Sequence, residues 1–329
     1  MRPCRTASLQ AILFVFFIGA TSADPLPSWN DGPAKSRIVA FVTAAVATAG
    51  PNAIEPSARV AVFDNDGTLW AEQPLYFQFV FVLDRIKALA PQHPEWKTQQ
   101  PFKAVLDNDL GSLQIDEKTV AQLLEATHAG MTTDAFAVSG TNWIATARHP
   151  RFHRPYSDLV YQPMMELLRY LRANGFKTYI VSGGGVEFMR AFAETVYDIP
   201  PEQVIGSSGV TKFQIGADGK PELIKEPKVE FVDDGPGKPV GINKFIGRRP
   251  VFASGNSDGD QQMLEWTAAG SGPRFEGLVH HTDAAREYAY DRNSKIGKLD
   301  KALDEANAKG WLVVDMKKDW RTVFPPVDR

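Results

Sequence analysis

The chain has 329 residues, of which 43% are hydrophobic, and its formal net charge is −3. This length and composition allow one or two domains with a sizeable core. The slightly acidic balance gives no sign of a nucleic-acid partner, because a basic surface is what nucleic acids attract. The sequence carries no signal for an oligomeric state.

Residues 1–23 show the three-part pattern of a secretory signal peptide. Arg2 and Arg5 precede a ten-residue apolar run at 11–20, and small residues follow it. Ten apolar residues are too few to span a bilayer, so cleavage at the end of this segment is expected. The mature chain would then be exported, periplasmic or secreted, without a membrane attachment. An uncleaved anchor or an ordinary N-terminal helix is the alternative.

The first half of the chain predicts one helix, one strand and a helical insertion. After an extended lead-in at 24–36, a helix is expected at Arg37–Ala49 and a strand at Val60–Phe63. Residues 76–154 place apolar side chains at helical spacing, with no convincing strand among them. We therefore expect a helical cap at 76–154, inserted into a core made of 24–75 and 155–329.

Strands alternate with helices from residue 155 onward. Hairpin-like segments are expected at 206–236. The expected helices lie at 162–175, 186–198, Val240–Arg248 and 261–269, and the expected strands at 177–185, 250–254, 277–281 and 311–316. This alternation predicts an α/β fold, a three-layer Rossmann-like core whose parallel sheet is covered on both faces. In such folds ligands bind at the carboxyl ends of the strands, where three polar turns fall.

The first polar turn, DNDGT at 64–68, places two carboxylates at the end of a strand. Asp64 and Asp66 can reach the same small volume, where they repel each other unless a cation or a proton joins them. Mg²⁺ suits such a site because it binds carboxylates and phosphate oxygens. With the metal, Asp64 could attack phosphorus and Asp66 could move a proton. A solvated turn is the alternative; a calcium loop fails because Gly67 falls at the wrong position for an EF-hand.

Two further turns offer anion and cation ligands. Ser182 and Gly183 begin the turn SGGG, where a hydroxyl and free N–H groups favour an anion. A tight turn that needs positive φ is the alternative. The turn GNSDGD supplies Asn256, Asp258 and Asp260 as oxygen ligands for a magnesium ion. Helix capping is the alternative, although it needs only one such residue.

A bound phosphate also needs a fixed positive charge, for which Lys238 and Lys244 are the candidates. The helix expected at Val240–Arg248 leads into a strand and runs antiparallel to it, so its N-terminus lies at the ligand edge of the sheet. Lys238 is favoured because Lys244 lies more than one helical turn further away. A merely solvated lysine is the alternative for both.

Together the motifs resemble those of haloacid dehalogenase (HAD) superfamily phosphatases, in the same order and at strand ends. DNDGT is similar to the first motif, the strand ending in Ser182-Gly183 to the second, Lys238 to the third, and GNSDGDQQML to the fourth. The inserted helices resemble the type-one cap of the phosphoserine-phosphatase-like branch.

The resemblance implies an Mg²⁺-dependent phosphomonoester hydrolase that forms an aspartyl-phosphate. Asp64 would be the nucleophile, and Asp66 the general acid and then base, with its backbone carbonyl on the metal. The expected phosphate ligands are Thr68, Ser182, Gly183 and Lys238, and the expected metal site comprises Asp64, Asp66, Asn256 and Asp260. The second acid favours a phosphatase over the dehalogenase branch.

The chain departs from the family pattern at Asn256, where members usually have Asp. One negative charge is thereby missing from the metal shell, and Asp258 or Asp260 could take over. For the substrate, Glu72 and two arginines of the cap, Arg148 and Arg151, resemble the Glu and Arg with which phosphoserine phosphatases grip the amino acid. A basic stretch that packs the cap on the core is the alternative for the arginines.

The substrate is expected to be a small phosphorylated molecule, and two kinds of specificity are considered. An exported phosphatase would meet mixed phosphomonoesters, so broad specificity is expected, with a dedicated phosphoserine phosphatase as the alternative. A non-catalytic, metal-stabilised binding protein is the alternative from another functional class.

Overall fold

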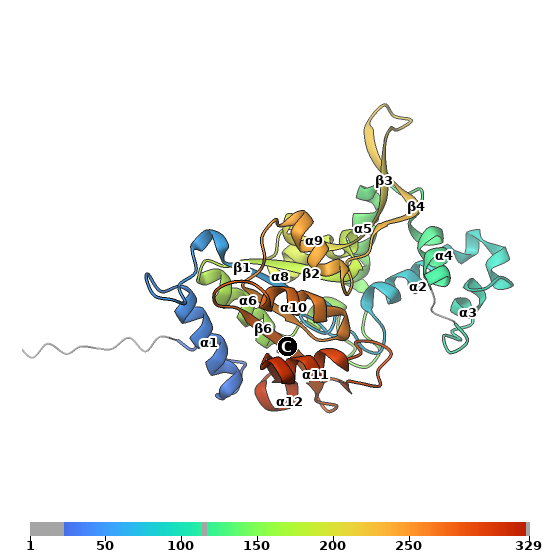
Figure 1. The fold of residues 1–329 in the computed structure, drawn as a ribbon. Coiled ribbons are helices and arrows are strands. Elements are labelled where there is room, and N and C mark those ends of the chain that lie inside the picture. The colour runs from blue at the N-terminus through green and yellow to red at the C-terminus, as the bar shows by residue number, and fades with distance from the viewer. Residues whose placement is uncertain (1–22, 114–116, 327–329) are drawn as a thin grey trace, which may run out of the picture.

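The computed structural model describes residues 23–113 and 117–326, so nearly all of the expected signal peptide lies outside the described residues. An eight-stranded sheet forms the middle layer, with helices on both faces (Figure 1). The strand order is β4-β3-β2-β1-β5-β6-β7, and β8 pairs with β6. The strands are β1 (Val60–Phe63), β2 (Lys177–Gly185), β3 (Val204–Ile215), β4 (Pro221–Phe231), β5 (Phe252–Gly255), β6 (Phe275–Thr282), β7 (Ala289–Tyr290) and β8 (Leu312–Asp315). The expected α/β sheet is confirmed.

The register of the central strands brings three turns to one edge of the sheet. β1 lies between β2 and β5 and is parallel to both, with Phe63 opposite Ile180 on one side and Ser254 on the other. The carboxyl ends of these strands therefore meet, as the sequence predicted. Among the named strands of the described residues, two pairs are antiparallel, β4 with β3 and β7 with β6.

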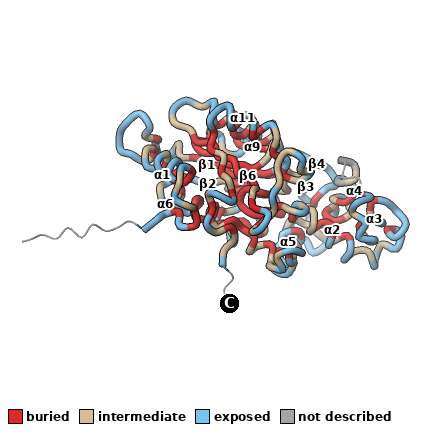
Figure 2. The backbone as a smooth tube through the Cα atoms, turned by 90° about the horizontal axis from the view of Figure 1, so that it is seen from below, coloured by how far each residue is buried: buried red, intermediate tan, exposed pale blue. Residues whose placement is uncertain are grey.

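The continuous apolar run of β1 follows from its burial on both faces. Val60 and Val62 pack into one core cluster, whereas Ala61 and Phe63 pack into the other. Figure 2 shows β1, β2 and β6 in the buried centre of the molecule. The first cluster is covered by α9 (Gly237–Phe245), α10 (Gln261–Ala268) and α11 (Lys301–Lys309), and the second by α1 (Pro33–Ala45), α6 (Gln162–Ala173), α7 (Val186–Arg190), α8 (Ala193–Tyr197) and α12 (Met316–Asp319).

The described part of residues 76–154 is helical and contributes no strand to the sheet. Its helices are α2 (Phe77–Leu89), α3 (Phe102–Leu106), α4 (Glu117–His128) and α5 (Thr133–Thr146). A small core of their own holds the outer part together, built on Val82, Ile86, Trp96, Val105 and Leu123. In Figure 1, α2, α3 and α4 form a lobe beside the sheet. The limits of a cap domain remain a prediction.

Two helix starts and the continuity of a third helix differ most clearly from the sequence-based expectation. α1 begins at Pro33 rather than Arg37, because proline suits the first helical turn, where its missing N–H costs nothing. α9 begins at Gly237 rather than Val240. The helix expected at 186–198 is two short helices, since Phe192 leaves helical backbone angles with a φ of −136° and stacks its ring on Trp70.

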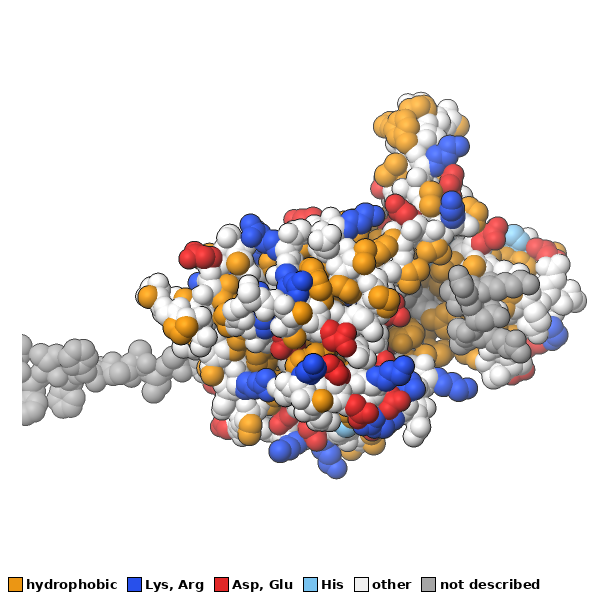
Figure 3. Space-filling view, in the orientation of Figure 1, with side chains coloured by type: hydrophobic (Ala, Val, Ile, Leu, Met, Phe, Trp, Pro, Cys, Tyr) orange, Lys and Arg blue, Asp and Glu red, His pale blue; other side chains and the backbone are white. Residues whose placement is uncertain are grey.

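A long hairpin made of β3 and β4 projects from the body of the molecule (Figures 1 and 3). The hairpin-like segments expected at 206–236 are thus confirmed. Toward its tip Phe213, Ile215 and Leu223 are 63%, 60% and 46% exposed. Within residues 23–113 and 117–326, no helix is both long and apolar enough to cross a membrane.

Candidate active site

Asp64 is fixed directly at the end of β1. Its backbone N–H donates to the Ser254 carbonyl of the neighbouring β5 at 2.9 Å, and only 6% of the residue is exposed. The sheet therefore determines where the carboxylate lies, and little room is left for it to move. The next turn is equally fixed, since the Asn65 carbonyl accepts from the N–H groups of Thr68 and Leu69.

Lys238 is the positive charge of the site. Its Nζ donates to Asp64 Oδ1 at 2.6 Å, to Asp260 Oδ1 at 2.5 Å and to the Val181 carbonyl at 3.0 Å. Burial alone would lower the pKa of Lys238, but the charges of Asp260 and Asp64 outweigh it and raise this pKa above its usual value. Lys244, by contrast, is exposed and lies over the rings of Phe231 and Phe245.

The early start of α9 explains this choice of lysine. Because the helix begins at Gly237, Lys238 stands in its first turn, next to the strand ends. The amine of Lys238, a residue that is 2% exposed, thus contacts a residue after β1, a residue after β5 and the Val181 carbonyl within β2.

Asp66 is held by a tryptophan that follows the first motif. The Trp70 indole Nε1 donates to Asp66 Oδ1 at 2.8 Å. Burial raises the pKa of Asp66 to about 6, although the Trp70 hydrogen bond and the charge of Lys238 lower it. A carboxyl group with such a pKa can carry a proton near neutral pH and release it again, as acid–base catalysis requires.

The second turn lies against Asp66. A Cβ added at Gly184 would lie 3.4 Å from Ser182 Oγ and 3.6 Å from Asp66 Oδ2, so these two side chains share one small volume. The Gly184 N–H donates to Ser182 Oγ at 3.1 Å, and the Gly185 N–H donates to Gln78 Oε1 at 2.6 Å. Gln78 belongs to α2, so the first helix of the lobe reaches over the glycine turn.

Asn256 follows β5 and connects two other predicted residues. The Thr68 hydroxyl donates to Asn256 Oδ1 at 3.0 Å, and Asn256 Nδ2 donates to Glu72 Oε1 at 2.8 Å. The Tyr290 hydroxyl donates to the same Glu72 oxygen at 2.8 Å. Glu72 is only 2% exposed, and this burial raises its pKa well above the usual range.

The other two acids of the fourth motif have different surroundings. Asp260 is fully buried, and its Oδ2 accepts from the N–H groups of Asn256 and Ser257 at 2.9 and 3.0 Å, while its Oδ1 binds Lys238. It therefore positions the loop and the lysine. Asp258 Oδ1 instead accepts from the N–H groups of Asp300 and Ala302, at the start of α11, so it acts in helix capping.

The two arginines of the lobe lie apart from this cluster. Arg148 is exposed, and its guanidinium donates to the His153 carbonyl at 3.4 Å. Arg151 is exposed as well; it donates to the Ala284 carbonyl at 2.8 Å and lies 4.4 Å over the Tyr288 ring. The Arg151 contacts join this stretch to the segment after β6, as expected of residues that pack on the core, whereas the Arg148 contact is local.

The charges of the cluster suit a divalent cation. Asp64 and Asp260 are buried on either side of Lys238, and Asp66 is half-buried nearby. Burial and the charge of Asp260 raise the pKa of Asp64 well above its usual range, while Lys238 opposes them. Within the described residues, no group of three or more His, Cys, Asp and Glu side chains is placed to hold a metal. Mg²⁺ does not need one, because it takes one or two carboxylates and fills its shell with carbonyl, water and phosphate oxygens.

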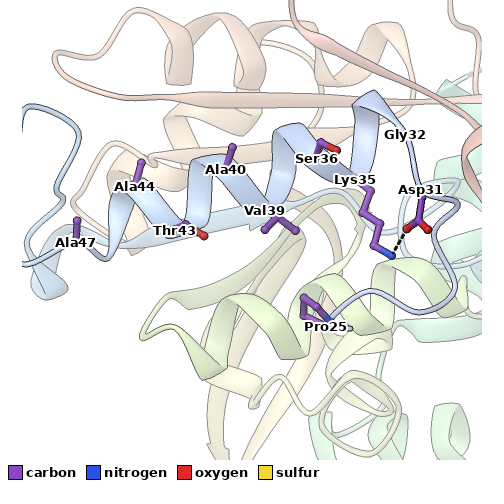
Figure 4. Close-up of a pocket in the computed structure, with 10 residues that line it drawn as sticks. All are labelled: Pro25, Asp31, Gly32, Lys35, Ser36, Val39, Ala40, Thr43, Ala44 and Ala47. Atoms are coloured by element: carbon purple, nitrogen blue, oxygen red, sulfur yellow. Dashed lines mark hydrogen bonds and ion pairs between the residues drawn. The ribbon is translucent and has the colours of Figure 1, made fainter. Parts of the chain in front are cut away.

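A surface hollow elsewhere on the molecule takes no part in this cluster. It runs along α1 and is lined by none of the predicted site residues (Figure 4). Its lysine, Lys35, is already paired with Asp24 and Asp31.

Sequence reasoning missed three residues that support the site. Trp70 holds Asp66 and Tyr290 holds Glu72, as described above. His281, on β6, has its Nε2 within 2.8 Å of the Gly67 carbonyl and its Nδ1 within 3.1 Å of buried Glu287. Only Trp70 had a nearby signal, since it lies two residues after the first polar motif; the others come from distant strands.

Comparisons with known proteins agree with the fold. A model of the haloacid dehalogenase-like hydrolase family matches residues 61–265, while no curated protein matches the chain. A conserved protein of unknown function from Anaerococcus prevotii DSM 20548 has a TM-score of 0.50 and 16% identity, covering 88% of this chain and 92% of that one. A protein of unknown function from Bordetella pertussis Tohama I has a TM-score of 0.49 and 17% identity, and the match covers 78% of this chain and 98% of that one. A phosphoserine phosphohydrolase-like protein from Francisella tularensis has a TM-score of 0.39 and 17% identity, and the match covers 76% of this chain and 99% of that one.

Proposed function

The chain belongs to the haloacid dehalogenase-like hydrolase family, and we propose that it is an Mg²⁺-dependent phosphomonoester hydrolase that forms an aspartyl-phosphate on Asp64. The main support is the position of the Lys238 amine, which donates to Asp64 at 2.6 Å and to the Val181 carbonyl beside Ser182 at 3.0 Å. A nucleophile, a cation and a hydroxyl thus converge where a phosphoryl group would fit.

Asp64 would begin the reaction by attacking the phosphorus atom of the ester. The bond between phosphorus and the ester oxygen breaks, and the leaving oxygen takes a proton from Asp66, whose pKa of about 6 suits this task. Lys238, Thr68 and Ser182 would hold the phosphoryl oxygens while negative charge moves between them.

Hydrolysis of the intermediate would use the same carboxylate in reverse. Asp66, now ionised, takes a proton from water, whose oxygen attacks phosphorus and releases Asp64 and inorganic phosphate. The side chains of Asp64 and Asn256 and the carbonyl of Asp66 would hold Mg²⁺, which offsets negative charge on the phosphoryl oxygens when bound.

Broad specificity on small phosphomonoesters is the more strongly supported proposal. A dedicated phosphoserine phosphatase of the expected kind would need a cap arginine for the carboxylate of the substrate, yet Arg151 is used on the Ala284 carbonyl and the Tyr288 ring. We further propose that residues 76–154 act as a cap, because Gln78 of α2 contacts the glycine turn of the site. We also propose that the protein is exported, because its N-terminus has the pattern of a signal peptide.

The test is a phosphatase screen of the purified mature protein with Mg²⁺ and with EDTA. We expect turnover of p-nitrophenyl phosphate and of several natural esters, and a loss of at least about 10³-fold in the Asp64→Asn variant with its fold retained. Strict preference for phosphoserine would overturn broad specificity. Absence of turnover, or full turnover by Asp64→Asn, would refute the enzyme proposed here in favour of a binding protein.

A further inference from the structure

The loop that follows β5 lacks a carboxylate where the family usually has one, and a buried glutamate lies directly behind it. Asn256 is neutral, but its Nδ2 donates to Glu72 Oε1 at 2.8 Å. Glu72 and Asn256 are separated by 184 residues in sequence. A buried acid therefore lies one hydrogen bond away from the position where the missing carboxylate would be.

The fold makes specific room for this carboxylate. A Cβ on Gly67 would lie 2.1 Å from Asn256 Nδ2 and 2.4 Å from Glu72 Oε1, and one on Gly297 would lie 1.8 Å from that same oxygen. Both glycines have positive φ, 73° and 61°. Two chain segments thus pass so close to Glu72 that only glycine fits, and the carboxylate is enclosed between them.

The hydrogen bonds determine how the amide is turned. Glu72 Oε1 accepts from both Asn256 Nδ2 and the Tyr290 hydroxyl, and Asn256 Oδ1 faces the Thr68 hydroxyl at 3.0 Å. Because a carboxylate can only accept from the amide nitrogen, it keeps the amide oxygen pointing away from itself, toward the first motif. An oxygen so directed is available to a cation held by that motif.

From this arrangement we infer that Glu72 is the acid that stands in for the carboxylate missing at Asn256, and that it orients the Asn256 oxygen toward the bound divalent cation. Glu72 is a positioning residue in this role, rather than the substrate ligand that the sequence suggested. This inference rests on the proposed function, because it presumes a cation at the first motif. Residues behind metal ligands commonly change metal affinity by about 10- to 100-fold when they are replaced.

The test measures cation binding rather than turnover. Mn²⁺ binding by the full mature chain is followed through the electron paramagnetic resonance signal of free Mn²⁺, with Mg²⁺ as competitor. We expect Glu72→Gln to weaken Mn²⁺ binding by about 10-fold or more. The matched control is Glu276→Gln, which replaces another buried glutamate, at the start of β6, and should bind Mn²⁺ like the wild type.

A second substitution provides the decisive comparison. Adding Asn256→Asp to Glu72→Gln restores the charge and reverses the hydrogen bond, since the new amide donates to the new carboxylate. We expect the double variant to bind Mn²⁺ within about threefold of the wild type. Binding by Glu72→Gln within about twofold of the wild type, or no recovery in the double variant, would overturn the inference.

Other outcomes separate this inference from the proposed function. Normal Mn²⁺ binding by Glu72→Gln, together with a raised KM for a phosphorylated amino acid, would return Glu72 to a substrate role and leave the phosphatase intact. No divalent binding by the wild type would overturn both. If Glu72→Gln does not fold, Asn256→Asp alone must bind Mn²⁺ more tightly than the wild type, and weaker or equal binding refutes the added charge.

Discussion

Lys238→Met should destabilise the metal-free protein strongly, because it removes the lysine that two buried acids, Asp64 and Asp260, contact. The Nζ atom makes three hydrogen bonds, two of them to the carboxylates of Asp64 and Asp260, and the side chain is 2% exposed. Breaking a buried ion pair by removing one partner typically costs about 3–5 kcal/mol. We expect a loss of that size in the free energy of unfolding, measured by urea denaturation in EDTA at pH 8.

The pH dependence of this loss has a definite sign. Lys238 lowers the pKa of Asp64, so its removal lets this pKa rise further above the usual value. An acid whose pKa is raised by folding destabilises the native state above that pKa, and protonation relieves the effect as the pH falls. The difference between Lys238→Met and the wild type should therefore shrink from pH 8 to pH 5.

Two controls make the reasoning refutable. Lys244→Met removes an exposed lysine of the same helix and should cost no more than about 1 kcal/mol. Combining Lys238→Met with Asp64→Asn should recover part of the stability, since one uncompensated charge is removed as well. A loss below about 1 kcal/mol for Lys238→Met, or one that grows on acidification, would refute the charge balance described here.

Three further perturbations test other parts of the structure. Burial raises the pKa of Glu276 to about 7, so Glu276→Gln should be about 2 to 3 kcal/mol more stable than the wild type at pH 8 and equal to it at pH 4; equal unfolding midpoints at both would contradict this. Trp70→Phe removes the hydrogen bond that lowers the pKa of Asp66 and should move the alkaline limb of kcat/KM upward by about one pH unit; an unmoved or lowered limb would count against Asp66 as the acid. Gly67→Ala should lower the free energy of unfolding by at least about 2 kcal/mol more than Gly219→Ala. Both glycines have positive φ, but only a Cβ at Gly67 would clash with Asn256 and Glu72. Similar thermal denaturation midpoints for the two variants would contradict this crowding.

The fold and the centre of the site follow from sequence because they depend on local patterns. The apolar run Val60–Phe63 predicts a buried strand, and a parallel sheet collects the residues after its strands at one edge. Asp64, Ser182 and Asn256 are therefore placed together by topology alone. Lys238 could be preferred over Lys244 by the same reasoning, although α9 starts earlier than its apolar spacing indicated.

The surroundings of the site could not be predicted in this way. Tyr290 donates to Glu72 across 218 residues of sequence, from the short antiparallel strand β7. Such a contact depends on how a loop returns over the sheet edge, and neither spacing nor composition records that path. The same holds for Arg151, whose charge suggested a substrate ligand but whose partner is a backbone carbonyl of the segment after β6.

The neutral side chain of Asn256 is interpreted differently once its hydrogen bond to Glu72 is known. Taken by itself, Asn256 suggests a weakened metal site. With Glu72 hydrogen-bonded to it, an aspartate at 256 would place two buried acids in direct contact, in a cluster where Asp64 and Asp260 already share Lys238. The amide avoids that repulsion and still offers an oxygen to a cation. The departure from the family pattern at Asn256 is therefore explained by the buried Glu72 beside it.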